Sequence, residues 1–175
     1  GLLILKKPKL DLFTFLFKII ISQQISDKIA DDIWSKICSK IGLANPQIQI
    51  FSNKDYLDKI LNEISISNQK KKYICGIYKV IKENQLNITS LKKMNYEQFC
   101  HSLSRLYGVG PWTCDMTQIF FFNKKNIFPK NDLVINKVSK KLDEMEKKKI
   151  NIKKRFSPFL SIFTLHLWKM SKRIL

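Results

Sequence analysis

The chain has 175 residues, of which 45% are apolar and 26% are charged, a balance that excludes a wholly disordered segment. A chain of this length forms one domain or two coupled lobes, and it buries about 70% of the surface of its unfolded state without needing a metal or a disulfide. The 32 lysines and arginines exceed the 14 aspartates and glutamates, which gives a net charge of +18. Such an excess indicates a polyanionic partner, either nucleic acid or an acidic membrane surface.

The longest apolar stretch near the N-terminus, Leu12–Ile21, is too short to span a bilayer. It is not followed by a small-residue cleavage site, so we expect no signal peptide. We therefore expect an intracellular protein that is not inserted in a membrane, nuclear in a eukaryote and cytoplasmic in a bacterium.

The cysteines stand far apart and form no CxxC pair: Cys38, Cys75, Cys100 and Cys114. This spacing argues against a structural zinc site or an iron–sulfur cluster, so we expect reduced, buried thiols. The two histidines, His101 and His166, are isolated, and we expect both to be structural.

Apolar residues at helical spacing predict helices over nearly the whole chain, and therefore an all-α fold. In chain order, the predicted helices are Ser26 through Ile41, 54–64, 68–84, Asn95 to about 106, Pro111 to about 122, Asn131 or Asp132 through Met145, and a last helix from Ser157 and Pro158. That last helix is apolar on all sides, so we expect it to be central and buried. The two alternating stretches 47–51 and 64–67 are predicted to be loops, and the basic stretch 146–155 an exposed connection.

Two glycines flank one apolar residue between two predicted helices, in the segment Leu106-Tyr107-Gly108-Val109-Gly110-Pro111-Trp112-Thr113. Glycine permits positive φ and close backbone approach, and Val109 is suited to plug the turn into the core. The amides of Gly108 and Gly110 would then point outward with the next helix N-terminus and form an anion site. In a chain of this charge the expected anion is a nucleic-acid phosphate. A simple tight turn explains the same spacing.

Asp132 lies at the start of a predicted helix, after the short basic loop Phe128-Pro129-Lys130-Asn131. The helix dipole favours an ionised carboxylate at this position. An ordinary helix cap explains the same placement, so the spacing alone does not identify a catalytic group.

The hairpin followed by Phe128–Asp132 resembles the helix-hairpin-helix and Gly/Pro-rich-loop-Asp signature of DNA glycosylases, and the nearest branch is DNA-3-methyladenine glycosylase II. Three further segments agree with this branch in order: Ile21–Ser26, Ile66–Ser67 with Lys70 and Tyr73–Ile74, and Ser157–Ser161 with Leu167–Trp168. Together the matches run from about residue 12 to residue 170. The resemblance implies a single all-α, two-lobed domain over 1–175 with a DNA-binding cleft, one lobe being roughly 27–130 and the other 1–26 plus 131–175.

By this resemblance the catalytic carboxylate is Asp132, which would stabilise positive charge on the sugar and orient or deprotonate water. The lysine that makes some members of the superfamily cut the strand aligns with Trp112, which cannot form a Schiff base. We therefore expect a monofunctional enzyme with Trp112, Phe159 and Gln23 around the flipped base. Core packing remains open for Trp112 and Phe159.

The implied DNA contacts are Gly108, Val109, Gly110, Thr113 and Gln24, with Gln24 entering the gap left by the flipped base. Capping of a loop remains open for Gln23 and Gln24. No cofactor is required, although the main-chain carbonyls of Ser104, Leu106 and Val109 align with a Na⁺ or K⁺ site of the family. Several positions depart from the family pattern: Tyr107 for proline, Asn131 for a second acid, Leu160 for arginine, and Met116 and Leu133 for pocket aromatics.

The resemblance implies a monomeric enzyme that flips and excises an alkylated purine of the 3-methyladenine type from double-stranded DNA, by hydrolysis of the N-glycosidic bond in base excision repair. Two alternatives keep the fold: a glycosylase for mismatched uracil or thymine, and a non-catalytic DNA-binding module. A basic protein of the membrane surface is a third.

Overall fold

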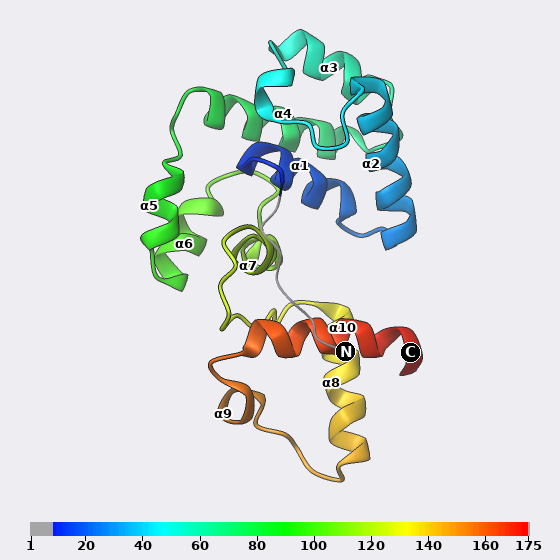
Figure 1. Ribbon diagram of the computed structural model, residues 1–175, viewed down its shortest axis with the longest axis vertical. Coiled ribbons are helices and arrows are strands. Elements are labelled where there is room, and N and C mark those ends of the chain that lie inside the picture. The colour runs from blue at the N-terminus through cyan, green and yellow to red at the C-terminus, as the bar shows by residue number, and fades with distance from the viewer. Residues whose placement is uncertain (1–8, 175) are drawn as a thin grey trace. The chain divides into compact units, whose positions relative to one another are not determined.

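The computed structural model describes residues 9–174, and over these residues the regular structure is entirely helical (Figure 1), which confirms the all-α prediction. The helices are α1 Leu12–Ser22, α2 Asp27–Ile41, α3 Lys54–Asn62, α4 Asn68–Lys82, α5 Ile88–Lys93, α6 Tyr96–Leu103, α7 Pro111–Met116, α8 Leu133–Met145, α9 Ile152–Phe156 and α10 Leu160–Ile174. A 3₁₀ turn spans Ile48–Ile50, and a π-helical turn, Thr117–Phe121, follows α7. No helix in the described part of the chain is long and apolar enough to cross a membrane.

The described residues divide into two compact units, with the boundary inside α7 between Cys114 and Asp115. This division differs from the expected lobes, which placed residues 1–26 with the C-terminal part and residues 115–130 with the central part. The physical reason is the packing of α1. Its Phe13 ring meets Tyr78 of α4 at 5.4 Å between centroids, and its Phe17 ring meets Trp34 of α2 at 5.8 Å.

Helix α1 is the centre of the first unit and lies against both α2 and α4 (Figure 1). It is buried on nearly all sides, at Leu12, Phe13, Thr14, Phe15, Leu16, Phe17, Ile20 and Ile21. Asp11 begins the helix by accepting the Thr14 amide at 2.8 Å, and its other carboxylate oxygen accepts the amide of Ile48. A stretch this apolar shows no single face, so its periodicity does not indicate which neighbours it meets.

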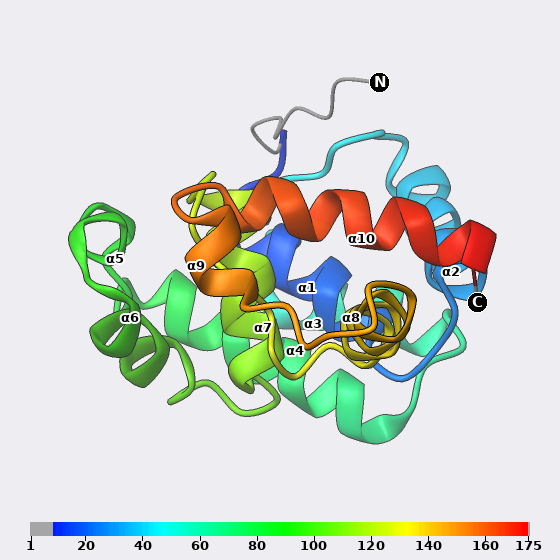
Figure 2. The same ribbon diagram turned by 90° about the horizontal axis from the view of Figure 1, so that it is seen from below.

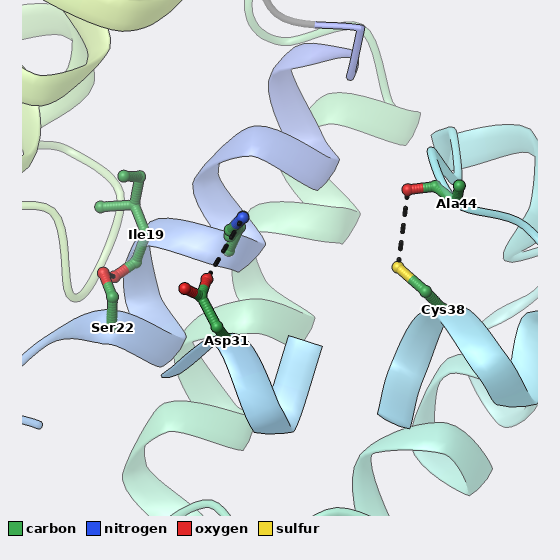
Figure 3. Close-up of polar contacts among 6 residues, drawn as sticks. Ile19, Ser22, Asp31, Cys38 and Ala44 are labelled. Carbon is green, nitrogen blue, oxygen red and sulfur yellow. Dashed lines mark hydrogen bonds and ion pairs between the residues drawn. The ribbon is translucent and has the colours of Figure 1, made fainter. Parts of the chain in front are cut away.

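The predicted helix ends in this unit are confirmed where local chemistry defines them. Ser26 caps α2 by accepting the Ile29 amide, and Gly42 ends that helix with a left-handed φ of 74°. Asn95 and Gln98 form the reciprocal capping box of α6. Figure 3 shows two contacts that close helix ends: the Cys38 thiol with the Ala44 carbonyl (3.7 Å) after α2, and the Ser22 hydroxyl with the Ile19 carbonyl (2.8 Å) at the end of α1.

In the second unit α10 lies across α8, as both Figure 1 and Figure 2 show. Ile135 and Val138 of α8 pack with Leu167 of α10 in a fully buried cluster. The last helix begins at Leu160 rather than at Ser157–Pro158, and the prediction that it is buried on all sides is wrong. Only Leu160, Ser161, Thr164 and Leu167 are buried, because α8 and the segment before it cover one face. Residues 147–149 and 153–155 are exposed as predicted, although part of this basic stretch forms the short helix α9.

The four cysteines are free thiols, and only Cys114 is buried. The other three are partly exposed, so the expectation of four buried thiols is wrong. Within residues 9–174, histidine, cysteine and carboxylate side chains form no group of three that could hold a metal ion.

Candidate nucleic-acid interface and candidate active site

The hairpin between α6 and α7 depends on Gly108. Its φ is 86°, a left-handed value that favours glycine, and a Cβ at this position would overlap the ring atoms Cγ and Cδ2 of Tyr73. The Val109 amide donates to the Leu106 carbonyl at 3.1 Å, which closes the turn. Val109 is 5% exposed and plugs the turn into the core, as predicted.

Gly110 differs from Gly108. Its φ is not positive, and a Cβ there would meet no atom within 4 Å. The sequence predicts that both positions require glycine, but only Gly108 does. Within the described residues, the amides of Gly108 and Gly110 have no acceptor. These two donors, next to the start of α7, are the part of the hairpin suited to an anion.

Gln23, at the C-terminal end of α1, holds the hairpin from the side. Its Nε2 donates to the Gly108 carbonyl at 2.9 Å and to the Thr113 hydroxyl at 3.1 Å. The side-chain amide of Gln23 therefore caps the hairpin loop, which is the alternative to a contact with the base. A contact between Gln23 and a base stays a prediction. Thr113 is 1% exposed, so its hydroxyl faces the protein.

Gln24 is exposed and has a φ of 59°, an unusual backbone conformation for a residue other than glycine. The turn that carries it is held by Lys70 of α4, whose Nζ donates to the carbonyls of Ile21 and Gln23, each at 2.7 Å. Burial lowers the pKa of the Lys70 ammonium. The first unit thus brings together the Gln23–Gln24 turn, the start of α4 and the hairpin.

Two aromatic residues flank the hairpin. Tyr107, which replaces the family's proline, is 84% exposed, whereas Trp112 in the first turn of α7 is half-buried. The contact of Trp112 with a flipped base stays a prediction. Met116, at the end of α7, is 3% exposed, so it belongs to the core.

The three carbonyls predicted to hold a monovalent cation lie along the same turn. The carbonyl of Leu106 accepts the Val109 amide, whereas the carbonyls of Ser104 and Val109 accept no donor within the described residues. The two carbonyl oxygens that accept no hydrogen bond, and the second lone pair of the Leu106 carbonyl, could each coordinate such a cation. The cation itself stays a prediction.

Asp132 is the N-cap of α8 and is 7% exposed. Its Oδ1 accepts the Ile135 amide at 2.9 Å, and its Oδ2 accepts the indole N–H of Trp168 at 3.3 Å. The Trp168 ring is stacked on Phe120, with 5.7 Å between centroids and 25° between planes. Helix α10 thus supplies a side chain that orients the carboxylate. The sequence contains the Leu167–Trp168 motif, but the motif does not predict that the Trp168 indole binds Asp132.

In the second unit, Phe159 is a predicted contact of the flipped base, and Leu133 stands where the family places a pocket aromatic. Phe159 is 56% exposed and is therefore not a core residue of this unit. Leu133, directly after Asp132, is 76% exposed. Both are apolar side chains that the unit itself does not cover.

Residues 17–160 match the HhH-GPD superfamily base excision DNA repair protein family. Among individual proteins, the chain is 28% identical over 129 residues to the putative DNA-3-methyladenine glycosylase YfjP of Bacillus subtilis, covering 71% of this chain and 44% of YfjP. It is 25% identical over 170 residues to the alkylbase DNA glycosidase-like protein mag2 of Schizosaccharomyces pombe, covering 90% of this chain and 76% of mag2.

The fold is shared with the S. pombe 3-methyladenine DNA glycosylase Mag1, solved in complex with abasic DNA. The TM-score is 0.78 at 23% identity, over 98% of this chain and 85% of Mag1. The helical fold, the glycine hairpin and the Asp132 cap agree with the family match, which covers most of the chain. The chain belongs to the HhH-GPD superfamily of base excision DNA repair proteins.

Proposed function

We propose that this protein is a monofunctional DNA glycosylase that excises alkylated purines of the 3-methyladenine type from double-stranded DNA. The observation that carries the proposal is the carboxylate of Asp132, which is buried and fixed at both oxygens. The resemblance of the surrounding sequence to DNA glycosylases supports a catalytic role for this residue. The relatives named as 3-methyladenine glycosylases support the substrate class.

The chemistry follows from what an oriented carboxylate does. As the bond between sugar and base breaks, positive charge develops on the deoxyribose, and a fixed negative group beside it lowers the free energy of the transition state. The same carboxylate orients or deprotonates the attacking water. An alkylated purine is already cationic and leaves readily, so strong acid assistance is not needed. Because Trp112 cannot attack the sugar, the product is an intact strand with an abasic site.

DNA binding rests on the hairpin and on charge. The two amides of Gly108 and Gly110 bind one phosphate of the backbone, and the main-chain carbonyls of Ser104, Leu106 and Val109 would hold a Na⁺ or K⁺ if one binds. Exposed lysines neutralise further phosphates, so affinity falls steeply with salt. Trp112 is the proposed stacking partner of the flipped base, and the protein acts as a monomer.

The deciding experiment measures release of free base from a methylated duplex by wild type and by Asp132→Asn. The variant retains the shape of the cap but loses the charge, so we expect its rate to fall by roughly 100-fold or more, as for removal of one strong electrostatic group. Binding to undamaged duplex should remain within about threefold, because Asp132 does not contact the hairpin phosphate in this proposal. If neither protein releases base although both bind DNA, the non-catalytic module is correct.

Substrate class and strand cutting need separate assays. Duplexes carrying mismatched uracil or thymine test the alternative lesions, and preferential release of either base contradicts the assignment to alkylated purines. The product strand should stay uncut until heat or alkali is applied. Spontaneous cleavage with a borohydride-trapped adduct would show that an amine of this chain attacks the sugar.

A further inference from the structure

We propose that Lys70 is a positioning residue that fixes the Gln23–Gln24 turn against the hairpin, so that Gln24 stands ready to fill the gap left by a flipped base. This inference rests on the proposed function and extends it to a residue outside the hairpin and the Asp132 cap. Lys70 does not touch DNA in this proposal and acts only through the turn.

The contacts of Lys70 show an unusual use of a lysine. The partly buried Lys70 donates from its ammonium to two carbonyls, those of Ile21 and Gln23, each at 2.7 Å. These groups lie at the C-terminal end of α1, where the helix dipole concentrates negative charge. Burial opposes the charged form and lowers the pKa of the group, so the bonds to the carbonyls must offset a desolvation cost.

The bond to the Gln23 carbonyl fixes the peptide that joins Gln23 to Gln24. Gln24 has a φ of 59°, a conformation that persists only where its surroundings impose it. Gln23 is fixed on its other side by the bonds from its Nε2 to Gly108 and Thr113. The turn is therefore held by α4 through Lys70 and by the hairpin through Gln23. Gln24 is exposed to solvent, while its backbone is held in one position.

Helix α4 also contacts the hairpin directly. Tyr73, three residues after Lys70, lies against Gly108 so closely that a Cβ there would overlap its ring. Helix α4 thus contacts both the Gln23–Gln24 turn, through Lys70, and the hairpin, through Tyr73. The adjacent lysines do not share this role: Lys71 donates to the Asn62 side chain at 3.1 Å, and Lys72 is exposed.

The test uses discrimination between two duplexes, which requires no turnover. One duplex is intact and the other carries a tetrahydrofuran abasic site, whose gap Gln24 would fill. The proteins are wild type, Lys70→Met, Gln24→Ala, the double variant, and Lys72→Met as a control one residue away. Circular dichroism checks folding, and if Lys70→Met does not fold, Lys70→Gln takes its place, because the shorter amide does not reach both carbonyls.

We expect wild type and Lys72→Met to prefer the abasic duplex, and we expect Lys70→Met to lose roughly tenfold of that preference while its affinity for intact duplex stays within about twofold. The double variant should be no worse than Gln24→Ala, because both changes act on one group. An unchanged preference in Lys70→Met, losses that multiply in the double variant, or a wild type without preference would each overturn the inference. Absence of base release by wild type, with these binding results intact, would instead contradict the proposed enzyme activity.

Discussion

Trp168 donates its indole N–H to Oδ2 of Asp132 at 3.3 Å, although the two residues lie 36 positions apart in the chain. The other carboxylate oxygen is occupied by the Ile135 amide. The two bonds come from different helices and fix both the position and the rotation of the carboxylate. Trp168 is itself fixed by its stacking on Phe120 and by the apolar cluster around Leu167.

Replacing Trp168 with phenylalanine should remove the N–H donor and retain an aromatic ring against Phe120. We expect the single-turnover rate of base release to fall by roughly 5- to 30-fold, the effect of losing about 1–2 kcal/mol from a hydrogen bond to a charged group. The affinity for damaged duplex should change less than the rate. A fall in affinity with an unchanged rate would show that the ring of Trp168 contacts the substrate rather than orienting Asp132.

The two hairpin glycines should respond differently to alanine. At Gly108 the new Cβ meets Tyr73 and the backbone has positive φ, so we expect Gly108→Ala to lose about 2–4 kcal/mol of unfolding free energy. At Gly110 no atom lies within 4 Å of the new Cβ, so Gly110→Ala should change stability by less than about 0.5 kcal/mol. Urea unfolding measures both. Equal losses would show that the two glycines serve the same purpose.

Substitution of Gln23 by leucine should destabilise the hairpin, because the Gly108 carbonyl and the Thr113 hydroxyl both lose the donor that the amide supplies. The expected loss is about 1–3 kcal/mol, as for partly buried acceptors that lose a hydrogen-bond donor. Gln24→Asn is the matched control in the next residue, since asparagine tolerates left-handed φ and the position is exposed. Thermal and urea unfolding should show little change for this control.

Cys75 should be the slowest of the partly exposed thiols to react with iodoacetamide at pH 8. Burial, and then the hydrogen bond from its thiol to Asp58 at 3.1 Å, raise the pKa of Cys75 to about 12, so the reactive thiolate is scarce. Because the pKa in the folded state lies above the ordinary value of 9.0, this group favours folding below pH 9 and loses that contribution as the pH rises towards 12. Mass spectrometry of labelled peptides gives the rate at each cysteine. Labelling of Cys75 as fast in the native protein as in urea would contradict the assignment.

Features with a local cause can be predicted from the order of the residues alone. Ser26, Gly42 and the Asn95–Gln98 pair mark helix ends through bonds to residues within four positions, and Asp132 begins α8 by the same kind of bond. The hairpin is also local, because Gly108 and Val109 build it from adjacent residues. These signals also indicated the family, whose match spans residues 17–160.

Contacts between residues far apart in the chain depend instead on how the helices pack. The 85 positions between Gln23 and Gly108, and the 36 between Asp132 and Trp168, carry no periodic signal. The unit to which α1 belongs and the single buried face of α10 depend on which helix covers each apolar surface. The hydrophobic effect that drives this packing has no direction, so shape complementarity between helices selects the partners, and a one-dimensional pattern of apolar residues does not contain that information.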